Sequence, residues 1–156
     1  MHWSDVIADN CLQDLPYKIE LNKYGKIEMS PASNRHGFYQ NKVARLLEKA
    51  RPDGIVIIEC AIETEDGVKV ADVVWGSEIF YQQHSIDETP FTIAPEICVE
   101  IISPANSQAE MNKKKQLYFN QGAKEVWLVS LEGNIQLFDH KSIITISQFS
   151  IPIKKL

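Results

Sequence analysis

The sequence lacks the long apolar runs that mark membrane proteins and the leader that marks secreted ones. None of its 156 residues lies in a stretch approaching the roughly 18 consecutive apolar residues of a membrane span. The opening residues, MHWSDVIADN, contain no basic region followed by an apolar run, so no secretory signal peptide is expected. These two absences favour a cytoplasmic protein that has no membrane contact.

Cysteine and histidine are too sparse and too scattered for the common structural motifs built from them. Cys11, Cys60 and Cys98 are odd in number, lie far apart and include no CxxC pair, which argues against a disulfide framework or a zinc ribbon. Small apolar fillers in a reducing compartment explain these cysteines. The histidines show neither HxxxH nor HExxH spacing, so a zinc site is not expected; they are His2, His36, His84 and His140.

An excess of positive charge is also lacking. The net charge is −5 and the isoelectric point is about 5.4, which argues against a protein that coats nucleic acid. A local basic face is still compatible with the sequence, because positive charge gathers in residues 35–51 and 113–115. With 44% hydrophobic and 24% charged residues, the chain is expected to form one domain over residues 1–156 around one core.

The periodicity of apolar residues predicts an α/β (α+β) fold with a central mixed β-sheet flanked by helices. Two short strands are expected within residues 17–30, and the tail 143–153 is apolar enough to pack on its own sheet or on a partner chain. A hairpin is expected around Asp66-Gly67, a dipeptide favoured in two-residue turns. The other predicted elements are a helix at 34–50, an irregular segment at 77–94, a buried strand at 97–102, a helix at 107–121 and strands at 125–130 and 134–139.

Two carboxylates fall inside apolar strands, where an unpaired acid is costly. Asp72 lies within VKVADVVW and Glu100 within ICVEII. A turn centred on Asp66-Gly67 would pair Ala61 with Asp72 and make Glu59 a diagonal neighbour of Asp72, about 7 Å away. Backbone amides or a basic side chain could satisfy each acid separately. One divalent ion, Mg²⁺ or Mn²⁺, would satisfy both acids, because carboxylate oxygens are the ligands these ions prefer.

Several segments in this order resemble the Uma2 family, which is assigned to the restriction-endonuclease-like superfamily. They are GKIEMSPASNRHG, VKVADVVW, PEICVEIISPANS, a K-x-x-x-Y pair and GAKEVWLV, and together they extend from about residue 17 to residue 138. The superfamily motif is PD followed by (D/E)xK. The resemblance implies a restriction-endonuclease-like fold and a Mg²⁺-dependent (or Mn²⁺-dependent) endonuclease that hydrolyses phosphodiester bonds of DNA.

The resemblance assigns the metal ligands residue by residue. Asp72 corresponds to the aspartate of PD, with Ala71 in place of the proline, and Glu100 corresponds to the acid of (D/E)xK. The backbone carbonyl of Ile101, at the variable position of that motif, is a further metal ligand by the same analogy. Glu59 is expected as an additional acid of the catalytic site, and Glu20 and Glu28 are weaker alternatives.

The catalytic lysine is displaced from its usual position. Ile102 stands where the lysine of (D/E)xK is expected, whereas sequences of this family carry a lysine on the following helix. The K-x-x-x-Y match assigns that role to Lys114, four residues before Tyr118. Lys113 and Lys115 flank it, so the choice among three consecutive lysines stays open.

Contacts to nucleic acid are expected from the first long helix. The candidates are His36, Arg35 and Lys42. His36 matches a histidine common in such sequences and would contact phosphate or the site, although packing or capping at the helix terminus is the alternative. For the basic residues of this helix, a solvated face is the alternative to contact with a DNA backbone.

Three functions are therefore compared. The first is a metal-dependent endodeoxyribonuclease that acts on DNA as a homodimer, with the tail 143–153 and the segment 77–94 as candidate contact surfaces. The second is a nuclease-fold module that binds nucleic acid or another partner but no longer cleaves, which the isoleucine at position 102 favours. The third is an interaction protein without a metal.

Overall fold

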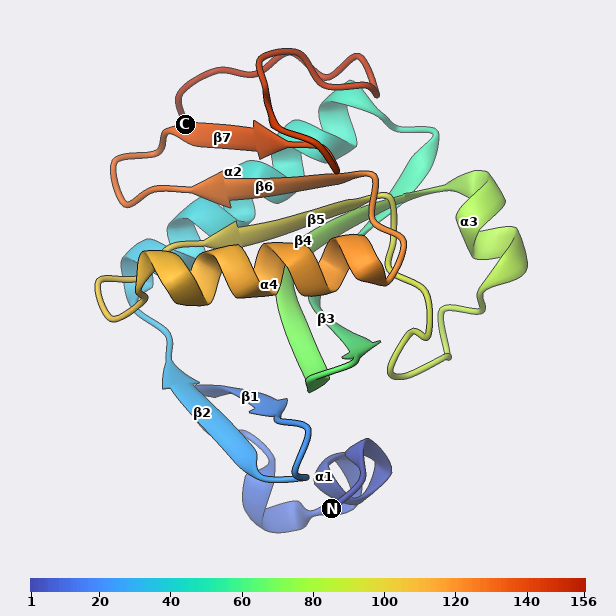
Figure 1. Cartoon of the computed structure of the whole chain (residues 1–156), viewed down its shortest axis with the longest axis vertical. Helices are drawn as coiled ribbons and strands as arrows, with labels where there is room; N and C mark the ends of the chain where they lie inside the picture. Colours follow the sequence, from blue (N-terminus) through green and yellow to red (C-terminus); the bar gives the residue numbers. More distant parts are fainter.

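A six-stranded mixed sheet forms the centre of the computed structural model, which describes residues 1–156 (Figure 1). Its strand order is β3-β4-β5-β6-β7-β8; only β5 and β6 run parallel, and the other neighbours are antiparallel. The strands are β3 (Gly54–Thr64), β4 (Gly67–Ser77), β5 (Ile97–Ile101), β6 (Glu125–Val129), β7 (Ile135–Phe138) and β8 (Ile143–Ile144). The predicted mixed sheet is confirmed.

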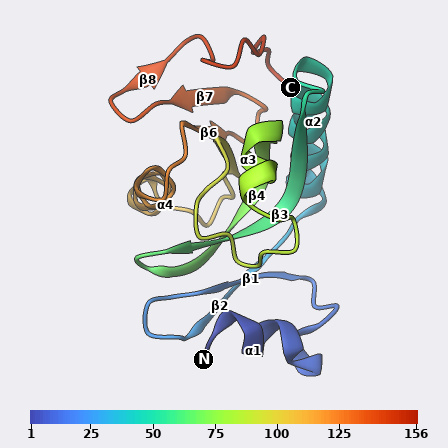
Figure 2. The ribbon, with the colours of Figure 1, turned by 90° about the vertical axis from the view of Figure 1, so that its right-hand side faces the viewer.

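One long helix covers each face of this sheet. Helix α2 (Asn34–Ala50) and helix α4 (Gln108–Asn120) lie on opposite faces, with the strands between them (Figure 2). Alternate side chains of the strands therefore enter two separate cores. Val99 and Trp127 belong to the core under α2, and Cys98 and Leu128 to the core under α4. The short helix α3 (Glu78–Gln83) adds Phe80 to the α4 side.

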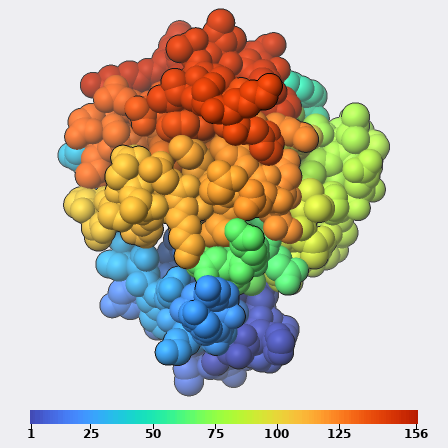
Figure 3. All heavy atoms as spheres, viewed as in Figure 1, coloured from blue at the N-terminus to red at the C-terminus, as the bar shows by residue number.

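The first 31 residues form a layer of their own at one end of the sheet. It contains helix α1 (Trp3–Ala8), a 3-10 turn (Asn10–Leu12) and a two-stranded sheet of β1 (Tyr17–Leu21) and β2 (Ile27–Pro31). In the space-filling view this segment is the blue lobe below α4 (Figure 3). Val6 and Leu21 form a small core with Val68 of β4, which attaches the lobe to the central sheet. Helix α1 was not expected from the sequence.

The predicted register of the β3–β4 hairpin was wrong by two residues. Thr64 pairs with Gly67, so the turn is centred on residues 65–66 instead of 66–67. Gly67 has φ +83°, and a Cβ there would lie 2.3 Å from the carbonyl oxygen of Leu21. Glycine at this position thus permits both the turn and the close approach of the N-terminal layer. The preference for Asp-Gly in two-residue turns reflects only the turn.

The structure also shows how the first long helix and the tail pack. Phe38 of α2 is 53% exposed, whereas its neighbour Tyr39 is buried in the core under that helix. The tail covers its own sheet: Ile151 is buried, and the buried carboxylate of Glu125 accepts hydrogen bonds from the hydroxyl of Ser147 and the backbone of residue 148.

None of the helices has both the length and the apolar character needed to cross a membrane.

Candidate active site

The candidate site lies where β4 and β5 separate. Their antiparallel pairing ends at Val73 and Val99, so the next residues, Asp72 and Glu100, no longer face each other across a ladder. The carboxylate of Asp72 replaces the missing backbone hydrogen bond between the strands, because its Oδ2 accepts a hydrogen bond from the backbone N–H of Ile101 at 2.7 Å. Both acids line a pocket of about 390 Å³ that is bounded by β1, β2, α2 and α4. The separation of two strands thus brings two buried carboxylates to a cavity wall.

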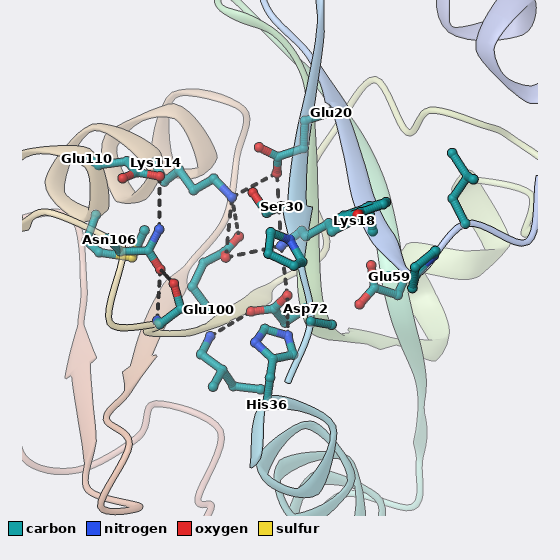
Figure 4. A pocket seen from close by; sticks show the side chains of 18 residues that line it. Lys18, Glu20, Ser30, His36, Glu59, Asp72, Glu100, Asn106, Glu110 and Lys114 are labelled. Carbon is teal, nitrogen blue, oxygen red and sulfur yellow. Dashed lines mark hydrogen bonds and ion pairs between the residues drawn. The ribbon is translucent and has the colours of Figure 1, made fainter. Parts of the chain in front are cut away.

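Two lysines from different elements reach these carboxylates (Figure 4). Lys18 of β1 donates to Asp72 Oδ1 at 2.7 Å, and its Nζ lies 3.4 Å from Glu100 Oε2. Lys114 of α4 donates to Glu20 Oε1 at 2.8 Å, and its Nζ lies 3.4 Å from Glu100 Oε2. Glu100 therefore interacts with both ammonium groups, whereas Asp72 interacts with only one of them.

Helix α2 contributes to the other side of the pocket. His36 Nε2 lies 3.2 Å from Asp72 Oδ1, close to the start of the helix. One turn later, the amide of Gln40 donates to Glu59 Oε1 at 2.6 Å and to the backbone carbonyl of Asp72 at 2.9 Å. The apolar periodicity of α2 turns its buried face to the sheet, and the polar residues at its N-terminal end meet the point where the strands separate.

Glu59 reaches the site through an unusual backbone conformation. Residues 58 and 60 pair with residues 73 and 71, which leaves Glu59 opposite Asp72 but outside the ladder. Its φ is +58°, a left-handed value that is rare for a residue with a side chain. Such local strain is characteristic of functional positions. The expected proximity of Glu59 and Asp72 thus exists, although it arises from direct opposition and not from the diagonal register predicted.

Burial and charge act against each other in this cluster. Burial alone would lower the pKa of Lys18, but Glu100 and Asp72 raise that pKa well above its ordinary value. Burial would raise the pKa of Asp72, but the charge of Lys18 and the hydrogen bond from His36 hold it far below its usual range. For Glu100, burial prevails and raises the pKa, since the lysines offset it only in part. The hydrogen bond to Asp72 raises the pKa of His36.

Ile101 and the three consecutive lysines differ in whether they line the pocket. Ile101 lines the pocket, although its side chain belongs to the core under α2. Lys113 pairs with Asp66, and Lys115 lies over the ring of Phe138, so neither of them points into the pocket. Of the three consecutive lysines, only Lys114 lines it.

The two basic residues expected to contact nucleic acid are directed elsewhere. Arg35 donates to the carbonyl of Leu131, in the turn between β6 and β7, and the ammonium of Lys42 lies over the ring of Phe38. Both are exposed and outside the pocket, in contrast to His36.

Sequence reasoning missed Lys18 and gave too little weight to Glu20. Both lie on β1, where the alternation in YKIEL places them on one face and Tyr17, Ile19 and Leu21 on the other. That alternation is a signal for a shared face. The side chain of Glu20 also accepts the backbone N–H of Val70 at 2.8 Å, which connects the N-terminal layer to β4.

The donor set fits a hard divalent cation. Three acids, Glu20, Asp72 and Glu100, face two lysines, Lys18 and Lys114, so the cluster carries a surplus of negative charge when His36 is neutral. Ligand atoms of His36, Glu59 and Asp72 also lie within 4.8 Å of one another. Carboxylate oxygens dominate both groups, and they suit Mg²⁺ or Mn²⁺ better than softer metals.

Comparison with known proteins identifies the family and the fold. Residues 10–139 match the family model of Uma2, described as "Putative restriction endonuclease". The fold is similar to the crystal structure of a putative nuclease belonging to DUF820 from Anabaena variabilis ATCC 29413, with a TM-score of 0.68 and 18% sequence identity. The similarity covers 85% of this chain and 83% of that chain, and it confirms the predicted fold. No curated protein matches the chain.

Proposed function

The chain belongs to the Uma2 family, and from this premise we propose that it is a metal-dependent endonuclease that hydrolyses phosphodiester bonds of DNA. One observation carries the proposal: Asp72, Glu100 and Lys114 line one pocket, and the ammonium of Lys114 contacts the carboxylate of Glu100. Two acids and a lysine are the groups that phosphodiester hydrolysis with a divalent ion requires.

The two buried acids are the proposed metal ligands. Asp72 and Glu100 would hold Mg²⁺ or Mn²⁺, together with the backbone carbonyl of Ile101. A bound ion would polarise the phosphoryl oxygen and would lower the pKa of water at the site. Ile101 supports this role from its other backbone group, because its N–H fixes the orientation of the Asp72 carboxylate.

Lys114 is the proposed stabiliser of negative charge in the transition state. Its ammonium is held between Glu20 and Glu100, and the side chain is only 12% exposed, so the charge lies at a fixed place in the pocket. A preorganised charge of this kind needs no reorganisation when the phosphoryl group becomes more negative. Tyr118 of the same helix orients Glu100 through the hydrogen bond that its hydroxyl donates.

His36 and Glu59 complete the pocket on the α2 side. Glu59 is exposed and is oriented by Gln40, so its carboxylate is free to take a ligand or to accept a proton from water. His36 is half-buried beside Asp72, where it can donate to a phosphate oxygen or support the metal ligand. Both roles place them next to the scissile phosphate, while Arg35 and Lys42 would act only through the backbone of a longer DNA.

The experiment is nicking of supercoiled plasmid in the presence of Mg²⁺ or Mn²⁺. Cleavage by the wild-type protein is expected to require the metal and to disappear in Asp72→Asn, which keeps the shape of the side chain but removes its charge. Lys113→Gln is the control, because Lys113 lies outside the pocket and pairs with Asp66. Metal-independent nicking, or full activity of Asp72→Asn, would refute the proposal.

A second candidate is a nuclease-fold module that binds nucleic acid without cutting it. The observation in its favour is Ile102, which packs against the core under α4 where the superfamily motif has a lysine. A gel-shift assay on the same plasmid, linearised, separates the two candidates. Binding without nicking at any metal concentration supports the module, and nicking supports the enzyme.

A further inference from the structure

Lys18 occupies the centre of the acidic cluster. Its Nζ lies 2.7 Å from Asp72 Oδ1, 3.4 Å from Glu100 Oε2 and 4.0 Å from Glu20 Oε1. In Figure 4 the ammonium lies between the carboxylates that the proposed function assigns to the metal. An ion bound by both Asp72 and Glu100 would need the same space.

The position of Lys18 is fixed by its strand. The paired strands β1 and β2 place Lys18 opposite Ser30, a pocket residue, and the side chain of Lys18 is only 11% exposed. On the same strand, Leu21 is buried in the small core of the N-terminal layer, and Glu20 accepts the N–H of Val70. A flexible surface lysine would have none of these restraints, so the ammonium is a built component of the pocket.

From these contacts we propose that Lys18 is an internal counter-ion that competes with a divalent cation for Asp72 and Glu100, and so sets the metal affinity of the site. The inference rests on the proposed function, because it concerns the same two ligands. Binding of the ion requires the Lys18 ammonium to release Asp72 Oδ1 and to move away from the incoming charge.

The oxygens of Asp72 explain why the two cations exclude each other. Oδ2 accepts the backbone N–H of Ile101, and Oδ1 faces both Lys18 and His36. A metal ion ligated by Oδ1 would lie within a few ångströms of the Lys18 ammonium, and like charges at that distance repel strongly in a buried pocket. Lys114 differs, because it has its own partner in Glu20 and makes no contact with Asp72.

The test is the affinity for Mn²⁺, measured by titration with electron paramagnetic resonance of the free ion. Lys18→Gln should bind Mn²⁺ about tenfold more tightly than wild type, or better, which is the scale of coupling between linked binding events. Lys113→Gln is the matched control: it removes the same charge from a side chain that is 63% exposed and lies outside the pocket. Its affinity should equal that of wild type, and Lys18→Arg, which keeps the charge, should also stay close to wild type.

The outcomes separate this inference from the proposed function. The inference is supported if Lys18→Gln binds Mn²⁺ more tightly than wild type and the double variant Lys18→Gln/Asp72→Asn loses this gain. It is also supported if Lys18→Gln binds Mn²⁺ and wild type does not. Equal or weaker binding in Lys18→Gln overturns the inference and leaves the metal site standing. If neither wild type nor Lys18→Gln binds Mn²⁺ at millimolar concentration, the metal-dependent function itself fails.

The inference is also testable if Lys18→Gln unfolds the protein. Without the ammonium, Asp72 and Glu100 are two buried like charges, and Lys18→Gln is then expected to fold only when a cation replaces Lys18. Mn²⁺ should restore its circular dichroism spectrum to that of wild type. A variant that stays unfolded in Mn²⁺ while Lys113→Gln stays folded would contradict the competition.

Discussion

Glu100 is the residue on which the interactions of the pocket converge. It is 3% exposed, and it interacts with the hydroxyl of Tyr118 and with the ammonium groups of Lys18 and Lys114. Removing a carboxylate from water costs several kcal/mol unless donors or opposite charges compensate. The three partners come from β1 and α4, so the stability of this one side chain depends on the docking of two separate elements.

The hydrogen bond from Tyr118 is expected to contribute measurably to stability. In Tyr118→Phe, Glu100 loses a fully buried donor, and the free energy of unfolding should fall by about 1–3 kcal/mol. Urea denaturation measures this difference. Tyr81→Phe is the control, because the Tyr81 hydroxyl donates to Ile55 over 3.3 Å at an exposed position, and its loss should cost about 0.5 kcal/mol or less. Equal costs in the two variants would contradict the role of Tyr118.

The kinetic prediction concerns Lys114. Lys114→Ala should lower the rate of plasmid cleavage by about 10²-fold or more, because one preorganised charge is lost in the transition state. Lys113→Ala and Lys115→Ala should cleave at nearly the wild-type rate, since their side chains contact Asp66 and Phe138 outside the pocket. A larger loss in either control than in Lys114→Ala would show that the catalytic lysine has been misassigned.

At the residue scale, the sequence predicted acids better than their partners. Asp72 and Glu100 stand out because a carboxylate in an apolar strand needs compensation, and that rule requires no knowledge of the fold. Lys18 gives no comparable signal. The alternation of its strand shows which side chains share a face, but what that face meets depends on a strand 54 residues away.

At the scale of elements, the approach of the N-terminal layer to β4 is the feature on which the pocket depends. The layer supplies Lys18 and Glu20, and it is attached by the small core around Leu21 and by the close passage of its backbone over Gly67. The bounds of the two long helices were predictable within a residue or two, α2 from its apolar periodicity and α4 from the Ser107–Glu110 capping box and Gly122 at its ends. The hairpin register was not predictable in this way. The position of Gly67 is also determined by its contact with the N-terminal layer, and the local sequence does not reveal that contact.

Gly67→Ala should therefore loosen this layer. A Cβ at position 67 would meet the carbonyl oxygen of Leu21 at 2.3 Å, and the residue has φ +83°, so we expect a loss of about 1–3 kcal/mol of stability. Gly37→Ala is the matched control, because Gly37 lies in α2 with no atom within 4 Å of an added Cβ. It should gain up to about 1 kcal/mol from helix propensity. Thermal melting compares the two, and an unchanged melting temperature in Gly67→Ala would contradict the close approach.

At the scale of the whole molecule, one chain offers one set of Asp72, Glu100 and Lys114, whereas cutting both strands of a duplex calls for two. Two-fold symmetry is the simplest way to supply them, so we expect a homodimer. Of the two surfaces considered, the tail is largely used by its own chain, with Ile151 buried. The segment 77–94 instead displays Ile79 at 66% exposure and is the surface we expect a second copy to cover.

Sedimentation at micromolar concentration tests this assembly. Wild type should sediment near twice 17.8 kDa, and Ile79→Lys should shift the protein toward a single chain, because a charge would be buried in the contact. Ile146→Lys is the control, since Ile146 is 79% exposed on the tail. A wild-type mass near 17.8 kDa would refute the dimer, and dissociation by Ile146→Lys alone would move the contact to the tail.

The long sequence separations across the pocket have a consequence for how the protein matures. Lys18 meets Asp72 across 54 residues and Glu100 across 82, and Lys114 meets Glu20 across 94. Contacts between such distant segments form slowly, and β1 leaves the ribosome long before α4 exists. The nascent chain therefore carries Lys18 and the acids without Lys114 until most of it has been synthesised. We expect the proposed catalytic centre to assemble as one of the last events of folding, so that a ribosome-bound fragment without α4 could not yet carry out the proposed cleavage.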